Sequence, residues 1–158
     1  MEKAAKFLEE GLKFLEGEKP KAKKAINYLA KAWKFYTKSK AWDKVYETLD
    51  KIADIYHKYL KEPRSALEYL DEKHDLMIKF GDFEGAINTL IQTADMFNQY
   101  EKGKDEALDF LRKAYAEIKK FKVGDNLIEV INEKITSILQ SLGKSEEFIR
   151  KYIKEHLD

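Results

Sequence analysis

One pattern of residues occurs three times in the sequence at a constant spacing. Residues 25–33 (AINYLAKAW), 66–74 (ALEYLDEKH) and 107–115 (ALDFLRKAY) are similar position by position, and successive copies begin 41 residues apart. Within each copy the small, aliphatic and aromatic residues fall at helical spacing. A helical pattern that returns at a fixed period of about 20 to 50 residues is typical of proteins that stack helical repeats. The chain is therefore predicted to be an all-α, right-handed α-α superhelix with a 41-residue repeat.

The segments between these copies align at the same spacing, as Leu49, Leu90 and Ile131 illustrate. Each repeat is therefore predicted to be a pair of antiparallel helices. The first helices are expected at 21–38, 64–80 and 104–121, and the second helices at 41–60, 83–101 and 126–142. Extending the alignment outwards adds a lone second helix at 2–16 and a lone first helix at 145–157, which would cap the stack.

The chain, 1–158, is expected to form one domain of about eight helices. Its parts would be a capping helix at 2–16, helix pairs at 18–60, 61–101 and 102–142, and a second capping helix at 144–157. Prolines are expected where first helices begin, at Pro20 and Pro63. Left-handed glycines are expected after second helices, at Gly17, Gly103 and Gly143. Side chains that cap helix N-termini are expected at Asp82, Asp125 and Ser145.

Composition excludes several classes of protein. With 44% apolar and 37% charged residues the chain can form a core, and its Lys-rich and Glu-rich charge resembles a thermophile's protein. No apolar run reaches the roughly 18 to 20 residues of a membrane helix, and the N-terminus lacks the apolar region of a signal peptide. A cytoplasmic protein with no integral membrane segment is expected. The absence of cysteine excludes thiolate nucleophiles and sulfur-ligated metals.

No set of residues converges on a catalytic or cofactor site. His57, His74 and His156 lie far apart in the sequence, without the spacing of a metal site, and no glycine-rich phosphate loop follows a predicted strand. His74 shares its place in the repeat with an aromatic residue in the other two copies, so a packed side chain is expected there. A pocket in which His74 meets two carboxylates would instead indicate an enzyme.

Charge is distributed unevenly although the net charge is only +1. The segment from residue 19 to residue 42 contains eight lysines and no acid, whereas residues 61–100 carry four cations against eight carboxylates. The basic first helix and its acidic neighbour can compensate each other by ion pairs across their packing seam. Alternatively, Lys24, Lys31, Lys34 and Lys38 recruit an acidic helix, a lipid or a nucleic acid. Nucleic acid is disfavoured because the net charge is near zero and the middle of the chain is acidic.

Most of the aromatic residues recur at helical spacing, which assigns them to packing between helices. Trp33 and Phe35 cannot both face the same side of one helix. One of the two is therefore expected to be partly exposed. An exposed aromatic ring beside lysines suits the binding of a partner.

Two motifs are similar to known helical repeats. Residues 80–87 (FGDFEGAI) and 104–114 (KDEALDFLRKA) resemble the tetratricopeptide repeat, although the period of 41 exceeds its usual length of about 34 residues. The longer repeat, with KAW at 40–42, GDF at 81–83 and KAY at 113–115, resembles the SNAP (soluble NSF attachment protein) family. Members of that family are adaptors that engage SNARE bundles and recruit a disassembly ATPase.

The resemblance implies that the first helices line a concave groove in which a partner segment binds. The groove residues would be Asn27, Lys34, Lys38, Glu68, Asp71, Asp75, Lys79, Asp109, Arg112 and Lys119. The predicted groove is basic at its start, acidic in its middle and of mixed charge at its end. It lacks the Asn and Lys set that grips peptide C-termini in chaperone-tail receptors.

The first capping helix carries two phenylalanines, Phe7 and Phe14, in a line beside its leucine face. They are expected to touch a second copy of the chain, or a membrane surface as the SNAP resemblance implies. The chain as a whole is predicted to be a non-catalytic adaptor that binds a protein or peptide, with no cofactor, no metal and no nucleic-acid partner. One alternative is a structural role through self-association, for example as a homodimer, in which the basic N-terminal end of one copy meets the acidic middle of another. The other alternative is a peripheral membrane adaptor.

Overall fold

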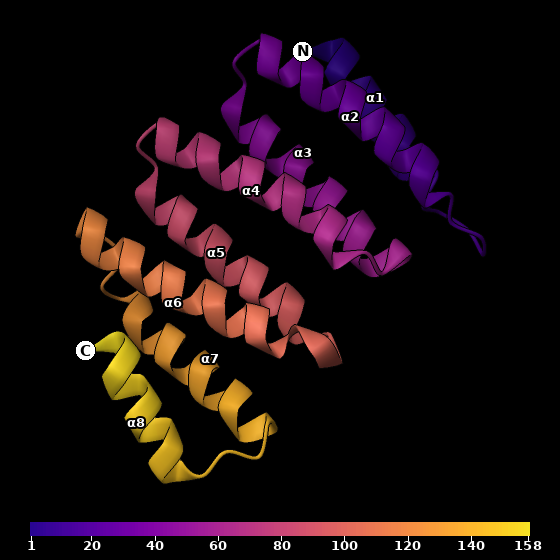
Figure 1. The fold of residues 1–158 in the computed structure, drawn as a ribbon. Helices are drawn as coiled ribbons and strands as arrows, with labels where there is room; N and C mark the ends of the chain where they lie inside the picture. Colours follow the sequence, from indigo (N-terminus) through magenta and orange to yellow (C-terminus); the bar gives the residue numbers. More distant parts are fainter. The chain divides into compact units, whose positions relative to one another are not determined.

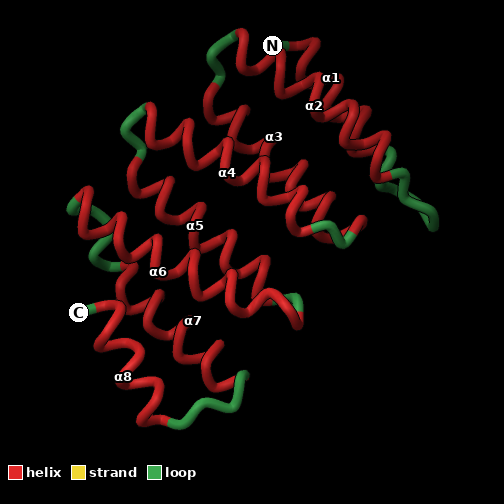
Figure 2. Tube along the Cα trace, in the orientation of Figure 1, coloured by secondary structure: helices red, strands yellow, loops and turns green.

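The computed structural model describes residues 1–158, and all of its regular structure is helical (Figures 1 and 2). The eight α-helices are α1 (Glu2–Lys13), α2 (Ala22–Lys38), α3 (Trp42–Ile55), α4 (Pro63–Lys79), α5 (Phe83–Asn98), α6 (Lys104–Phe121), α7 (Leu127–Ser141) and α8 (Glu146–Leu157). A π-helical turn, η1 (Tyr56–Leu60), extends α3, and a 3-10 turn, η2 (Glu101–Gly103), precedes α6. The all-α class and the eight predicted helices are confirmed, with ends shifted by a few residues.

The chain divides into two compact units, an N-terminal unit of Met1–Lys73 and a C-terminal unit of His74–Asp158. The division falls within α4, so the first part of this helix belongs to the N-terminal unit and its last residues to the C-terminal unit. Each unit has its own buried core, and each is described by itself below.

The core of the N-terminal unit lies where α1, α2 and α3 meet. Its centre is a cluster of buried residues from α2 and α3, and leucines of α1 and Leu60 of η1 pack around it. The buried members are Ala22, Ala25, Ile26, Leu29, Ile52 and Ile55. In α1, Gly11 is buried because its helix passes very close to α2: a Cβ at Gly11 would stand 2.9 Å from the Cβ of Tyr28. The apolar face of α1 is therefore used to cover α2, as the predicted capping role requires.

The core of the C-terminal unit is built by α5, α6 and α7. Its fully buried side chains include Ile87, Leu90, Leu111, Ile118, Ile131, Ile135 and Leu139. Two ring pairs accompany this core: Phe83 stacks on Phe121 with centroids 4.2 Å apart, and Phe97 stacks on Phe110 at 5.7 Å. The short helix α8 adds Ile149 and Leu157.

The repeated segments supply packing residues in both units. Their alanines, Ala25, Ala66 and Ala107, are fully buried, and their second aliphatic residues are buried as well. Because the same positions face a core in each copy, the predicted assignment of these residues to packing is confirmed. Two polar exceptions, Lys73 and His74, occupy buried positions of the second copy.

The predicted helix ends are confirmed in part. Pro63 is the first residue of α4, whereas Pro20 lies two residues before α2 begins. Among the predicted caps, Asp82 accepts a hydrogen bond from the Gly85 N–H at 2.9 Å, and Ser145 accepts one from the Phe148 N–H at 3.2 Å. The prediction for Asp125 is wrong, because α7 begins after Asn126 and has no side-chain cap.

Left-handed residues occur at two of the three predicted glycines and at positions that were not predicted. Gly17 has a φ of +89° and Gly143 one of +73°. The prediction for Gly103 is wrong: its φ is −102°, and it lies buried in η2. First helices also end in left-handed residues, at Lys40, Gly81 and Lys122, which are equivalent positions of the aligned sequence.

A glycine is required at position 103 because another part of the backbone lies very close to it, and not because its φ angle is left-handed. A Cβ at this position would stand 2.2 Å from the carbonyl oxygen of Phe97, which belongs to the backbone and cannot rotate away. We expect Gly103→Ala to lower the free energy of unfolding by about 1 to 3 kcal/mol because the backbone must shift. Urea denaturation measures this effect, and Lys102→Ala, at an exposed position of the same turn, is the control. Equal stability of the two variants would contradict the explanation.

Candidate functional site

The eight lysines between residues 19 and 40 are all exposed, and none of them forms an ion pair in the structure. Elsewhere in the N-terminal unit lysines do pair with carboxylates. The Nζ atom of Lys44 lies 2.8 Å from a carboxylate oxygen of Glu47, and the Nζ atom of Lys58 lies 3.1 Å from a carboxylate oxygen of Asp54. The five lysines that α2 itself carries, named here the basic face of α2, are Lys23, Lys24, Lys31, Lys34 and Lys38. This face is thus a concentration of uncompensated positive charge.

The predicted compensation between the basic face of α2 and the acidic neighbouring helix is therefore wrong. Rings rather than charges fill the seam between α2 and α4. Trp33 of α2 meets Tyr69 of α4 with centroids 6.0 Å apart, and Tyr69 stacks on Tyr56 at 5.6 Å. Burial raises the pKa of Tyr69, and the neighbouring Tyr56 adds to the rise, as expected for a ring that packs away from solvent.

A line of four aromatic rings runs along the other side of α2, where it meets α1. From one end to the other the rings are Phe14, Tyr28, Phe7 and Phe35, with successive centroids 5.2, 6.1 and 5.8 Å apart. We call this line the aromatic seam. Phe7 and Phe14 are half-buried in it, so these two rings pack against α2 of their own chain. Their contact with a membrane or a second copy stays a prediction.

Lysine ammonium groups lie over the rings of the aromatic seam. Lys24 is 5.9 Å from the centroid of Phe14, and Lys31 is 5.1 Å from that of Tyr28 and 5.5 Å from that of Phe7. Cation–π contacts at such distances are attractive, by about 0.5 to 1 kcal/mol at exposed sites. These lysines are therefore held by rings, which leaves their charges available to an anionic partner.

Phe35, at the end of the aromatic seam, is the exposed aromatic residue of α2. Its exposed fraction is 36%, whereas Trp33 is partly buried, which confirms that one of the two is exposed. Phe35 lines a shallow depression of about 130 Å³ together with Lys31, Lys34 and Lys38. An exposed apolar ring in a depression that lysines line suits an acidic segment that also carries an apolar side chain.

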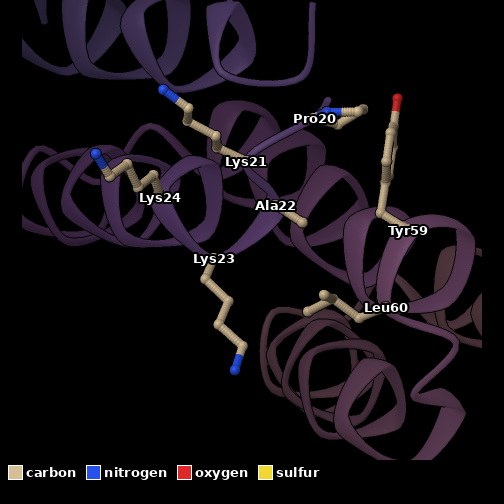
Figure 3. Close-up of a pocket in the computed structure, with 7 residues that line it drawn as sticks. All are labelled: Pro20, Lys21, Ala22, Lys23, Lys24, Tyr59 and Leu60. Carbon is tan, nitrogen blue, oxygen red and sulfur yellow. The ribbon is translucent and has the colours of Figure 1, made fainter. Parts of the chain in front are cut away.

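A larger cavity of about 380 Å³ lies at the beginning of α2 (Figure 3). It is lined by Pro20, Lys21, Ala22, Lys23, Lys24, Tyr59 and Leu60. Figure 3 shows the ring of Tyr59 beside Pro20, while the side chains of Lys21 and Lys24 extend to one side and that of Lys23 to the other. A second cavity of about 320 Å³ adjoins it, since both are lined by Lys23 and Leu60, and its other lining residues include Asn27, Tyr56 and Glu62. These cavities extend the basic face towards η1.

The other predicted groove residues are placed as follows. Glu68 and Asp71 are exposed on the part of α4 that belongs to the N-terminal unit. In the C-terminal unit, Asp75, Lys79, Asp109 and Lys119 are exposed, and Arg112 is half-buried. The structure brings Arg112 into an ion pair with Asp109, and it places Lys79 over Phe80 and Lys119 over Tyr115. A single groove that runs through all ten residues stays a prediction.

His74 meets two carboxylates, a combination that would indicate an enzyme if it lined a pocket. Its Nε2 lies 2.9 Å from Glu117 of α6, and its Nδ1 lies 3.2 Å from Asp75. The exposed fraction is 6% for His74, and 13% for the side chain of Glu117. A ring so enclosed, with each nitrogen already at a carboxylate of its own chain, matches the packed histidine that the repeat predicts. Glu117 itself has no signal in the sequence that would have identified it as the partner.

Two further observations bear on the function. No group of three or more His, Cys, Asp or Glu residues is arranged to hold a metal ion. None of the helices combines the length and the apolar character that crossing a bilayer requires. Among known proteins, no protein-family model matches the chain, and no curated protein matches it either.

Proposed function

We propose that this chain is a non-catalytic adaptor that binds an acidic segment of a partner protein on the basic face of α2. In this proposal the chain is a tetratricopeptide-like superhelix of 41-residue repeats, most similar in pattern to the SNAP family, and α2 is the first helix of its first repeat. The all-α structure and the burial of the repeated alanines support such an architecture.

One observation carries the proposal, namely that the lysines of α2 make no ion pair within the chain. Lysines that serve only to balance neighbouring acids would be found beside them, as Lys44 and Lys58 are. Uncompensated charge of one sign attracts a partner of the opposite sign and accelerates its association. The basic face of α2 therefore fits an anionic ligand.

The shape of the face favours a protein segment as that ligand. Lys24, Lys31 and Lys38 are each seven residues apart, which is two helical turns or about 10.5 Å. Acidic residues of a helix that lies along α2 can match this spacing. Phe35 lies between Lys31 and Lys38 and would receive an apolar side chain of the same segment. Each exposed ion pair contributes about 0.2 to 1 kcal/mol, so the charges mainly set orientation while the apolar contact adds affinity.

Charge reversal on the face tests the proposal. We expect the variant Lys31→Glu, Lys34→Glu, Lys38→Glu to lose the partner in affinity capture from native lysate, because three ion pairs of this size account for roughly three- to 150-fold in affinity and the reversed charges repel the acidic segment. Mass spectrometry of the captured proteins is the measurement. A second triple variant, Lys102→Glu, Lys113→Glu, Lys154→Glu, changes exposed lysines of the C-terminal unit and gives the same net charge. The proposal fails if both variants capture the same proteins as the unmodified chain.

A further inference from the structure

A stripe of negative charge lies beside the basic face of α2 on the neighbouring helix of the same unit. Glu68 and Glu72 of α4 are exposed, and neither forms an ion pair. The contact between Trp33 and Tyr69 places α4 next to α2. The N-terminal unit thus presents two stripes of opposite charge on adjacent helices.

The two stripes occupy equivalent positions of their helices. Lys31 follows the buried Leu29 by two residues, and Glu72 follows the buried Leu70 by two residues. The same offset places each charge about 200° around its own helix from the buried residue, and both side chains are exposed. Lys31 and Glu72 therefore mark equivalent outer positions of their helices, one positive and one negative.

No ion pair joins these opposite charges within the chain, and at the seam between the two helices the rings of Trp33 and Tyr69 are in contact. A surface with a positive stripe next to a negative stripe is complementary to a second copy of itself. Two copies can meet face to face around a two-fold axis that runs along the helices, midway between α2 and α4. Each α2 then lies against the partner's α4. An axis across the helices would bring like charges together and is disfavoured.

We propose that the chain associates with a second copy of itself through this surface, with the basic face of each α2 against the Glu68–Glu72 stripe of the other copy. Such an interface is isologous and closes after two subunits. Exposed ion pairs are individually weak, and salt screens them over about 8 Å at physiological ionic strength. The dimer should therefore be reversible and strongly salt-dependent. The acidic stripe of α4 carries the same negative charge that we propose for the partner segment. The second copy and the partner segment would therefore compete for the basic face of α2.

The competition between the second copy and the partner segment rests on the proposed function. The dimer itself does not, and it can be tested on the purified chain alone. Sedimentation equilibrium is measured at about 0.01 M salt, where the screening length is about 30 Å, and at about 1 M, where it is about 3 Å. The unmodified chain should be dimeric at low salt and monomeric at high salt. The control variant Lys102→Glu, Lys113→Glu, Lys154→Glu should behave in the same way.

Two variants with reversed stripes give the decisive comparison. The first variant is Lys31→Glu, Lys34→Glu, Lys38→Glu, in which both stripes are negative. The second variant is Glu68→Lys, Glu72→Lys, in which both stripes are positive. Each variant alone should be monomeric at low salt, because like charges would meet in its dimer. Mixed in equal amounts, the two variants should form a heterodimer, because each negative stripe of one variant then faces a positive stripe of the other. Recovery on mixing also shows that each variant is folded. A monomeric unmodified chain at low salt, self-association of either variant, or no heterodimer in the mixture would each overturn the proposal. None of these results depends on capture of a partner from lysate.

Discussion

Replacing His74 by alanine should lower the free energy of unfolding by about 3 kcal/mol, because it leaves the largely enclosed carboxylate of Glu117 without its partner. In the folded chain His74 Nε2 lies 2.9 and 3.0 Å from the two carboxylate oxygens of Glu117, which is largely enclosed between α4 and α6. Without the ring, the carboxylate keeps the cost of burial and loses the donor that offsets it. Thermal and urea denaturation measure the change.

Two further substitutions separate this loss from the loss of ring packing. His74→Gln keeps an amide that can donate to Glu117, so it should be less destabilising than His74→Ala. The double variant His74→Ala, Glu117→Ala removes the carboxylate too, and it should be more stable than the sum of the single substitutions predicts. If the losses of unfolding free energy from the two single substitutions add up to that of the double variant, His74 and Glu117 contribute only packing. The electrostatic explanation would then be wrong.

A second large effect is expected at Asp50, whose carboxylate holds the ammonium group of Lys73 between α3 and α4. Both oxygens of Asp50 lie 2.9 Å from Lys73 Nζ, and the exposed fraction of Lys73 is 8%. Asp50→Ala takes this carboxylate away from a buried cation, and we expect a loss of about 3 kcal/mol.

The opposite substitution should be tolerated better. Lys73 occupies the position of Ala32 and Ala114 in the other two copies, and both of those alanines are fully buried. Lys73→Ala therefore restores the residue that the packing accommodates elsewhere and leaves Asp50, which is about one-third exposed, in reach of water. A double-mutant cycle by urea denaturation should give a coupling of about 0.5 to 3 kcal/mol. If Lys73→Ala costs as much as Asp50→Ala, the buried cation is not the reason for the effect.

The helices could be predicted closely because their signals are local and repeated. Core positions such as Leu29 and Leu111 recur at one spacing, and Asp82 and Ser145 cap helices through atoms three residues away. Signals that depend on distant atoms were missed. Gly103 is fixed by a carbonyl oxygen from another turn, and a lysine at the left-handed position 122 has no preference that would reveal it.

The candidate site could be predicted only as a choice between two interpretations. The run of lysines was evident in the sequence, but whether ion pairs neutralise it depends on the rotation of α2 about its axis. The structure shows Trp33 at the seam with α4, and exposed lysines such as Lys31 over the rings between α1 and α2. The pairs of His74 with Glu117 and of Lys73 with Asp50 join residues from different helices, so neither follows from spacing along the chain.

The cation–π contacts of the aromatic seam have a consequence for entropy. A long side chain that is immobilised on binding costs about 0.5 to 1.5 kcal/mol. Lys24 and Lys31 already rest on Phe14, Tyr28 and Phe7 in the free chain, so part of their rotamer freedom is lost before any ligand arrives. An incoming acidic surface would meet a preorganised array of charges at these two positions. Lys34 and Lys38, which rest on no ring, would still have to be ordered.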